Sequence, residues 1–156
     1  RYIDQVAPSQ DLVAGFKESQ VAVPDFFEAL PAEKLDYRYA PGKWSIKEVL
    51  QHLIDTERIF MYRCFRIARR DQTVLAGFDQ EAYVAPSGAA FKTLNALLEE
   101  FQVERAHSIA LLTSLSDHDL AAAGVATQGS MSARAAAFTV IGHEIWHMEV
   151  IKSKYL

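Results

Sequence analysis

The sequence has one cysteine, no long apolar run and no apolar start, and each scarcity excludes a class of protein. Cys64 is the only cysteine among 156 residues, so no disulfide can form within the chain, which fits a reducing compartment. No apolar stretch approaches the roughly 20 residues that a membrane helix needs. The first ten residues are too polar for a signal peptide. We therefore expect a cytoplasmic protein that has no membrane partner.

The chain also lacks an excess of basic residues. Its formal net charge is −4, from 16 Lys and Arg against 20 Asp and Glu. General nucleic-acid binders normally have a basic domain, so this balance argues against a nucleic-acid partner. Half of the residues are hydrophobic and 23% are charged, as in ordinary globular proteins. The length is that of one domain, so we expect residues 1–156 to fold as a single unit.

Seven glycines and five prolines fall mostly between long segments of helical periodicity, and no segment has a convincing strand pattern. Ser9 and Ser132 are the expected N-caps of the first and last helices, and Pro24 should kink or interrupt the first. The connections between the helices all exceed ten residues, so both a simple up-and-down topology and a topology with crossover connections remain possible. The prediction is an all-α four-helix bundle with long inter-helix connections. The four helices are expected at roughly 10–30, 45–70, 89–115 and 132 to near the C-terminus.

The second helix has the clearest start signal. Ser45 is its expected N-cap, and Glu48 completes a capping box, while Trp44 can pack on Val49 as a hydrophobic staple. The end of this helix is rich in arginine. We expect these side chains to be solvated and to compensate the helix dipole, with binding of an anionic thiol or substrate by Arg63 and Arg66 as the alternative.

His143 and His147 form the strongest local feature, in the segment 143–147 (HEIWH). Residues four apart lie on the same face of a helix, about 5–6 Å apart at Cβ, so both imidazoles can reach one ion. On a helical wheel they fall on the apolar stripe of Ala136, Val140 and Ile151, which must face the bundle interior. Buried imidazoles need partners. Hydrogen-bonded core residues and metal ligands both remain open interpretations.

The same spacing matches the H-E-x-x-H signature of zinc metalloproteases, but that interpretation lacks a third ligand. Glu149 is the only potential ligand after His147, and it lies too near in sequence and on another face of the helix. A third ligand must come from another helix, and His52 is the candidate because it lies at the edge of an apolar stripe. Three neutral imidazoles would leave a position free for water or substrate, as in catalytic zinc sites.

Two E-x-x-H spacings, Glu104 to His107 and Glu144 to His147, raise the alternative of a di-iron carboxylate bundle. His107 points well away from the apolar stripe of its helix, and the second helix has no such spacing. We therefore expect one mononuclear site, with His107 and His118 at the surface.

These motifs together resemble one family, the DinB/YfiT-like superfamily of metal-dependent enzymes. The pattern that carries the resemblance is Trp44-Ser45-x-x-Glu48-x-x-x-His52, then Asp55 and Glu57, then a long gap to His143-x-x-x-His147. The resemblance covers essentially the whole chain, including the segments 40–43 (APGK) and 77–79 (GFD).

The resemblance implies a four-helix bundle that holds one divalent ion, zinc or nickel, on His52, His143 and His147. Family members with assigned activities include transferases and isomerases that use a low-molecular-weight thiol such as bacillithiol or mycothiol. Members are often dimers. We therefore expect a homodimer with a small-molecule substrate, acting as a metal-dependent thiol transferase or a related hydrolase. A non-catalytic, stress-related metal-binding protein of the same fold is the alternative.

Five further side chains have expected roles. Glu144 lies next to the histidine stripe and is the candidate catalytic residue, or else the partner of a nearby basic residue. Asp55 and Glu57 are expected at the surface or around the site. Cys64 is expected to be an inert core residue. Trp146 is expected to pack in the core or at an interface.

Overall fold

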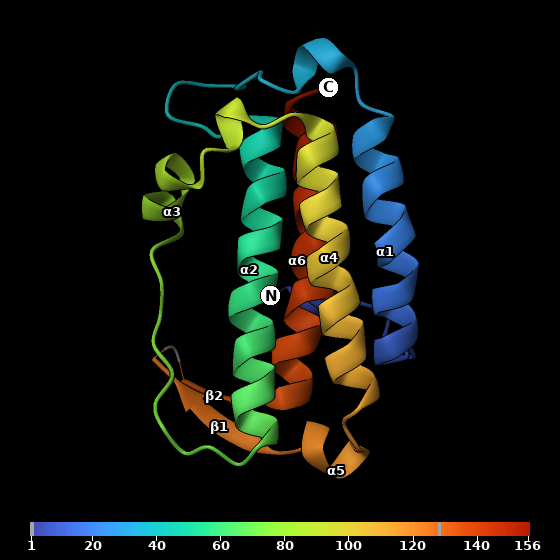
Figure 1. Ribbon diagram of the computed structural model, residues 1–156, viewed down its shortest axis with the longest axis vertical. Coiled ribbons are helices and arrows are strands. Elements are labelled where there is room, and N and C mark those ends of the chain that lie inside the picture. The colour runs from blue at the N-terminus through green and yellow to red at the C-terminus, as the bar shows by residue number, and fades with distance from the viewer. Residues whose placement is uncertain (1, 128) are drawn as a thin grey trace.

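Four long helices run along the longest axis of the computed structural model, which describes residues 2–127 and 129–156 (Figure 1). They are α1 (Leu12–Glu28), α2 (Ile46–Ala68), α4 (Leu94–Thr113) and α6 (Ala133–Lys154). Shorter helices lie between them, namely α3 (Gln80–Ser87), α5 (Asp117–Leu120) and the 3-10 turns η1 (Ile3–Gln5), η2 (Ala32–Lys34) and η3 (Ala89–Phe91). The predicted four-helix bundle is confirmed.

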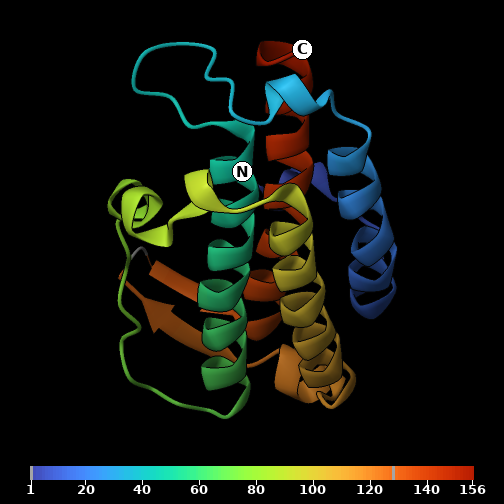
Figure 2. The ribbon, with the colours of Figure 1, turned by 45° about the horizontal axis from the view of Figure 1, so that its top comes forward.

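The wiring of the bundle includes a crossover. Helices α1 and α6 run in one direction, and α2 and α4 run in the opposite direction (Figure 1). Because α2 and α4 are parallel, the connection between them returns along the outside of α2 and carries α3 with it (Figures 1 and 2). The length of this connection, residues 69–93, is what makes the return feasible.

A small antiparallel hairpin departs from the all-helical prediction. Its strands are β1 (Ala123–Ala126) and β2 (Gly129–Ser132), and Leu75 forms a parallel bridge to Ala126. The two strands are only four residues long and consist mostly of small and polar residues, without an alternation of apolar and polar residues. The sequence therefore predicts a loop for this segment. Gly124 has a packing role, because a Cβ at its position would lie 2.6 Å from Cγ1 of Ile67.

The helix starts agree in part with the predictions. Ser45 and Glu48 form the expected capping box of α2, and Ser132 caps α6 through Ala135 N. Asp11 caps α1 in place of Ser9. Helix α4 begins after the cap Thr93, because the preceding residues from Ala89 form a separate 3-10 turn.

Pro24 lies inside α1 and does not interrupt it, which was one of the two effects expected of this residue. Proline has no backbone N–H, so the carbonyl of Gln20, four residues earlier, loses its helical donor. The side chain of Gln102 on α4 replaces that donor, with Nε2 2.9 Å from Gln20 O. A bond between two helices thus compensates for the proline.

The core consists of two apolar clusters. One combines the first halves of α1 and α6 with the second halves of α2 and α4, and the other combines the opposite halves. Phe16 and Ile67 belong to the first cluster, and Phe27 and Leu53 to the second. Buried polar side chains of α2, α4 and α6 lie between these groups along the helices, and we call them the polar layer. They are His52, Thr56, Glu57, Arg105, Ser108, His143, Glu144 and His147.

Arg105 is the centre of the polar layer and contacts all four long helices. Its Nε and Nη2 each lie 2.9 Å from a carboxylate oxygen of Glu57 on α2, and Nη2 also bonds Glu144 on α6. On α1, Nη1 donates to Ser19, and the ring of Phe16 lies 4.8 Å from the guanidinium carbon. Arg105 and Glu57 are completely buried.

The ion cluster leads to a first prediction. Arg105→Met should destabilise the metal-free protein by about 3–5 kcal/mol, because Glu57 and Glu144, both buried, would lose the cation with which they pair. The free energy of unfolding in urea measures the effect. Adding Glu57→Gln and Glu144→Gln to the same variant should recover part of the loss.

The matched control is Arg134→Met on α6. Arg134 pairs with Asp117, but its side chain is 43% exposed and that of Asp117 is 97% exposed. Exposed pairs contribute little, so the urea midpoint should hardly move. Equal effects of the two Arg→Met substitutions would contradict the assigned role of Arg105.

Candidate metal centre

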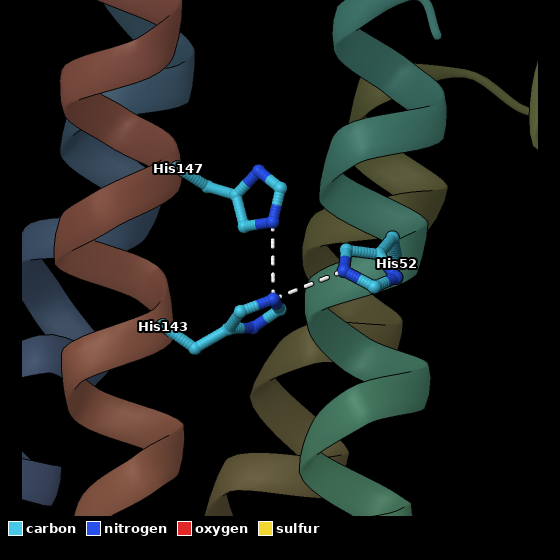
Figure 3. Close-up of side chains that lie close together, drawn as sticks. All are labelled: His52, His143 and His147. Atoms are coloured by element: carbon cyan, nitrogen blue, oxygen red, sulfur yellow. Dashed lines mark hydrogen bonds between the residues drawn. The ribbon is translucent and has the colours of Figure 1, made fainter. Parts of the chain in front are cut away.

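Three buried histidines meet between α2 and α6, the pair of helices with the most extensive contact. Figure 3 shows His52 on α2 facing His143 and His147 on α6, with the three rings directed at one another. His143 and His147 are one helical turn apart, as the sequence pattern requires. The structure therefore brings together all three residues that were predicted as metal ligands.

The nitrogens of the three rings lie within 4.8 Å of one another, and two of the three distances between them suit a shared ion. His143 Nε2 lies 3.0 Å from Nε2 of His52 and 3.0 Å from Nε2 of His147. Two nitrogens bound to one zinc ion at about 2.0–2.1 Å would lie about 3.0–3.4 Å apart. A hydrogen-bonded trio fits less well, because Nε2 of a neutral His143 has either one hydrogen or one lone pair, and neither serves two well-directed hydrogen bonds at once.

Burial keeps these imidazoles neutral, which is the form that binds a metal. Burial lowers the pKa of His52 to about 4. Burial, together with the nearby His52, lowers the pKa of His147 to about 3. The pKa of His143 is lowered well below its usual value, first by burial and then by the two other rings. Metal binding at neutral pH therefore requires little displacement of protons.

Neighbouring residues fix the orientation of the rings. Thr56 Oγ1 lies 3.5 Å from Nδ1 of His52, on the side of the ring away from the cluster. The ring of Trp44 lies 4.7 Å from that of His52, and the ring of Trp146 lies 4.6 Å from that of His147. Such contacts hold ligands in position and limit access of water.

A close approach of the N-terminal segment covers His143. The ring of Tyr2 packs edge-on against His143 at 4.9 Å. Gly142 permits this approach, because a Cβ at its position would lie 2.0 Å from the carbonyl oxygen of Tyr2. The sequence gives no sign of this role, because glycine within a helix has several common explanations.

One side of the cluster opens toward a cavity of about 190 Å³, with His147 in its wall. Within residues 2–127 and 129–156, the three histidines are the one group of His, Cys, Asp or Glu side chains positioned to share an ion. The arrangement therefore offers three neutral nitrogen ligands and an approach for a small molecule.

Glu144, the candidate catalytic residue, lies in the ion cluster of Arg105. Burial raises the pKa of Glu144 above its usual value, and the neighbouring Arg105 opposes this shift. Burial alone would lower the pKa of Arg105, but Glu144 and Glu57 raise it overall. The structure thus shows the second expected role of Glu144, as the partner of a basic residue. Its catalytic role stays a prediction.

The positions of other residues correct or confirm expectations. Arg63 is not a solvated helix end: it is 1% exposed and donates to the carbonyl of Ala76 at 2.9 Å. Of the two places expected for Glu57, the surface is excluded, because Glu57 is buried and pairs with Arg105 in the polar layer that also holds the histidines. Cys64 is buried, as expected, and His107 has a side chain that is 69% exposed.

Arg105 is the central residue that the sequence analysis did not identify. Arg105 lies one turn before Ile109 on the inner side of α4. In the sequence, the sole indication of this position is that an arginine occurs on the same helical face as apolar residues. Such an arginine is equally typical of a helix edge whose charged end reaches solvent.

The lowered pKa values of the histidines generate a second prediction, for the metal-free protein. The unfolded chain takes up protons on histidine as the pH falls below about 6.5, whereas folded His52 resists protonation until about pH 4. The unfolded state therefore binds more protons in this window, and the free energy of unfolding should fall as the pH is lowered from 6.5 to 4.

Urea unfolding at several pH values measures this slope. His52→Asn should make it shallower, whereas His107→Asn, at an exposed position, should leave it unchanged. A slope that His52→Asn does not alter would be inconsistent with a buried, neutral His52.

None of the described helices is long and apolar enough to span a membrane.

No protein with a curated description matches the sequence. Among solved structures, the chain is similar to YfiT from Bacillus subtilis, described as a probable metal-dependent hydrolase with an unusual four-helix bundle topology. The identity is 17% and the TM-score is 0.81, over 95% of this chain and 89% of YfiT. Residues 16–151 match the family model of the DinB superfamily. The chain belongs to the DinB superfamily.

Proposed function

We propose that the protein is a metal-dependent hydrolase that uses one divalent ion held by His52, His143 and His147. The observation that carries this proposal is the convergence of three neutral imidazole nitrogens beside a cavity. Imidazole ligands add no charge, so the charge of the ion is not offset by its protein ligands. The description of YfiT as a probable metal-dependent hydrolase supports the same class of reaction here.

When bound, a divalent ion supplies Lewis-acid chemistry: it polarises a carbonyl group and lowers the pKa of water or of a thiol. The residues of the chain prepare the site for this chemistry. Thr56 can accept a hydrogen bond from Nδ1 of His52, which leaves Nε2 free as a ligand. Trp44 and Trp146 cover the rings of His52 and His147 and exclude water from their flanks.

A transferase that uses a low-molecular-weight thiol, of the bacillithiol or mycothiol type, is the second candidate. Cys64 is the only cysteine of the sequence, and burial raises its pKa to about 12. The chain therefore has no reactive thiolate of its own, and thiol chemistry at this site needs a thiol from solution. Zinc and nickel are the ions we propose, because imidazole nitrogen is a good ligand for both.

The test is turnover of p-nitrophenyl acetate by untagged protein, stripped of metal and then reloaded with Zn²⁺ or Ni²⁺. Reloading should raise the rate by on the order of a hundredfold, because Lewis-acid stabilisation is worth several kcal/mol. His143→Ala should abolish the gain and the metal binding, whereas the control His107→Ala at an exposed position should retain both.

Addition of N-acetylcysteine to the reloaded protein separates the two candidates. Metal-dependent turnover without thiol supports the hydrolase. Turnover that requires both metal and thiol would replace it with the transferase. Stoichiometric metal binding with no turnover under either condition would contradict both enzymes and leave a non-catalytic metal-binding protein.

A further inference from the structure

The cavity beside His147 has five aromatic side chains in its lining. Tyr39 and Trp44 come from the loop before α2, Trp146 and Tyr155 from the second half of α6 and the residue after it, and Tyr2 from the N-terminal segment. These three segments are far apart in the sequence. Because they meet at a cavity that His147 also lines, it is a suitable place for the non-reacting part of a substrate.

Two of the five rings have their polar groups engaged within the protein. The indole N–H of Trp44 donates to Oε2 of Glu81 at 3.0 Å. The hydroxyl of Tyr155 donates to the carbonyl of Trp44 at 2.8 Å. Tyr155 also packs edge-on against Tyr39, with ring centroids 4.9 Å apart. Trp44 and Tyr155 therefore contribute to the cavity mainly as aromatic surface, next to polar lining residues such as Gln80.

The charged side chains of the lining do not select for the charge of a ligand. Among the described residues that line the cavity, Lys43 is the basic side chain and Glu81 the acidic one. Glu81 accepts a hydrogen bond from Trp44. One charge of each sign gives the side chains of the lining no net preference, so the aromatic rings are the feature by which this cavity can select.

The size of the cavity limits what it can hold. Its volume is about 190 Å³. An apolar cavity of about 150 Å³ in another protein binds benzene, so this one has room for a single six-membered ring with a short substituent. His147 lines the same cavity, so a ring held there lies next to one of the three histidines.

We propose that this cavity is an aromatic subsite, which selects substrates with a single ring, or an apolar group of that size, attached to the group that reacts at the three histidines. The proposal rests on the proposed metal-dependent function and adds its substrate class. Ring contacts and apolar burial provide the affinity, and the histidine cluster provides the reaction.

The test compares two metal-chelating probes, benzohydroxamate and acetohydroxamate, on the zinc-loaded full chain by calorimetry. Both probes carry the same chelating group, but benzohydroxamate has a phenyl group where acetohydroxamate has a methyl group. Benzohydroxamate should bind at least about tenfold more tightly, as expected for burial of a ring of this size. Tyr39→Ala and, separately, Trp146→Ala should reduce the preference to about threefold or less, by the same argument.

Tyr37→Ala is the matched control, because Tyr37 lies in the same loop as Tyr39 but does not line the cavity. It should keep the tenfold preference. Each variant is judged by the ratio of its two affinities, so a loss of zinc or of folded protein affects both probes alike.

The outcomes separate the subsite from the function on which it rests. Equal affinities of the two probes, or a preference that survives both cavity substitutions, would overturn the aromatic subsite while leaving the metal site in place. Failure of the protein to bind zinc at all would overturn the proposed function itself. A preference that falls in both cavity variants and survives in the control would support the subsite.

Discussion

The ion cluster of Arg105 with Glu57 and Glu144 is the interaction on which the rest of the structure depends. It joins α4 to α2 and α6 by charged hydrogen bonds and reaches α1 through Ser19, between two apolar clusters that pack without polar partners. Glu57 follows His52 by five residues on α2, about 7.5 Å along the helix axis, and Glu144 follows His143 directly on α6. The cluster therefore links the two helices that carry the histidines, close to the level at which the histidines meet.

The polar layer is costly for stability, and its composition indicates function. Apolar side chains of similar volume would stabilise such a layer at least as well as a buried ion pair does. The three imidazoles are buried side by side with lowered pKa values, and their nitrogens point at one place. Departures from a plain apolar core are expected at functional sites. In this bundle, the buried histidines are such a departure, and a cavity lined by His147 lies beside them.

Much of this organisation could be predicted from local sequence signals. The i, i+4 spacing placed His143 and His147 on one face, the capping box fixed the start of α2, and His52 followed from a compatible face together with the family resemblance. The pairing of Arg105 with Glu57 and Glu144 could not be predicted, because it depends on the rotation of three helices about their axes. The apolar stripes indicate that rotation only coarsely, too coarsely to show that Glu57 is buried. The hairpin was missed because its short strands of small residues depend on tertiary contacts such as Gly124 against Ile67.

The central claim is that one ion is shared by three imidazoles from two helices. Anomalous diffraction from a crystal of the untagged, zinc-loaded protein, recorded on both sides of the zinc absorption edge, tests it most directly. The account predicts a single peak about 2.0–2.1 Å from Nε2 of His52, His143 and His147, with no other protein ligand. A peak bound by only one or two of these histidines, a further protein side chain filling the remaining position, or no peak at the cluster would contradict the account.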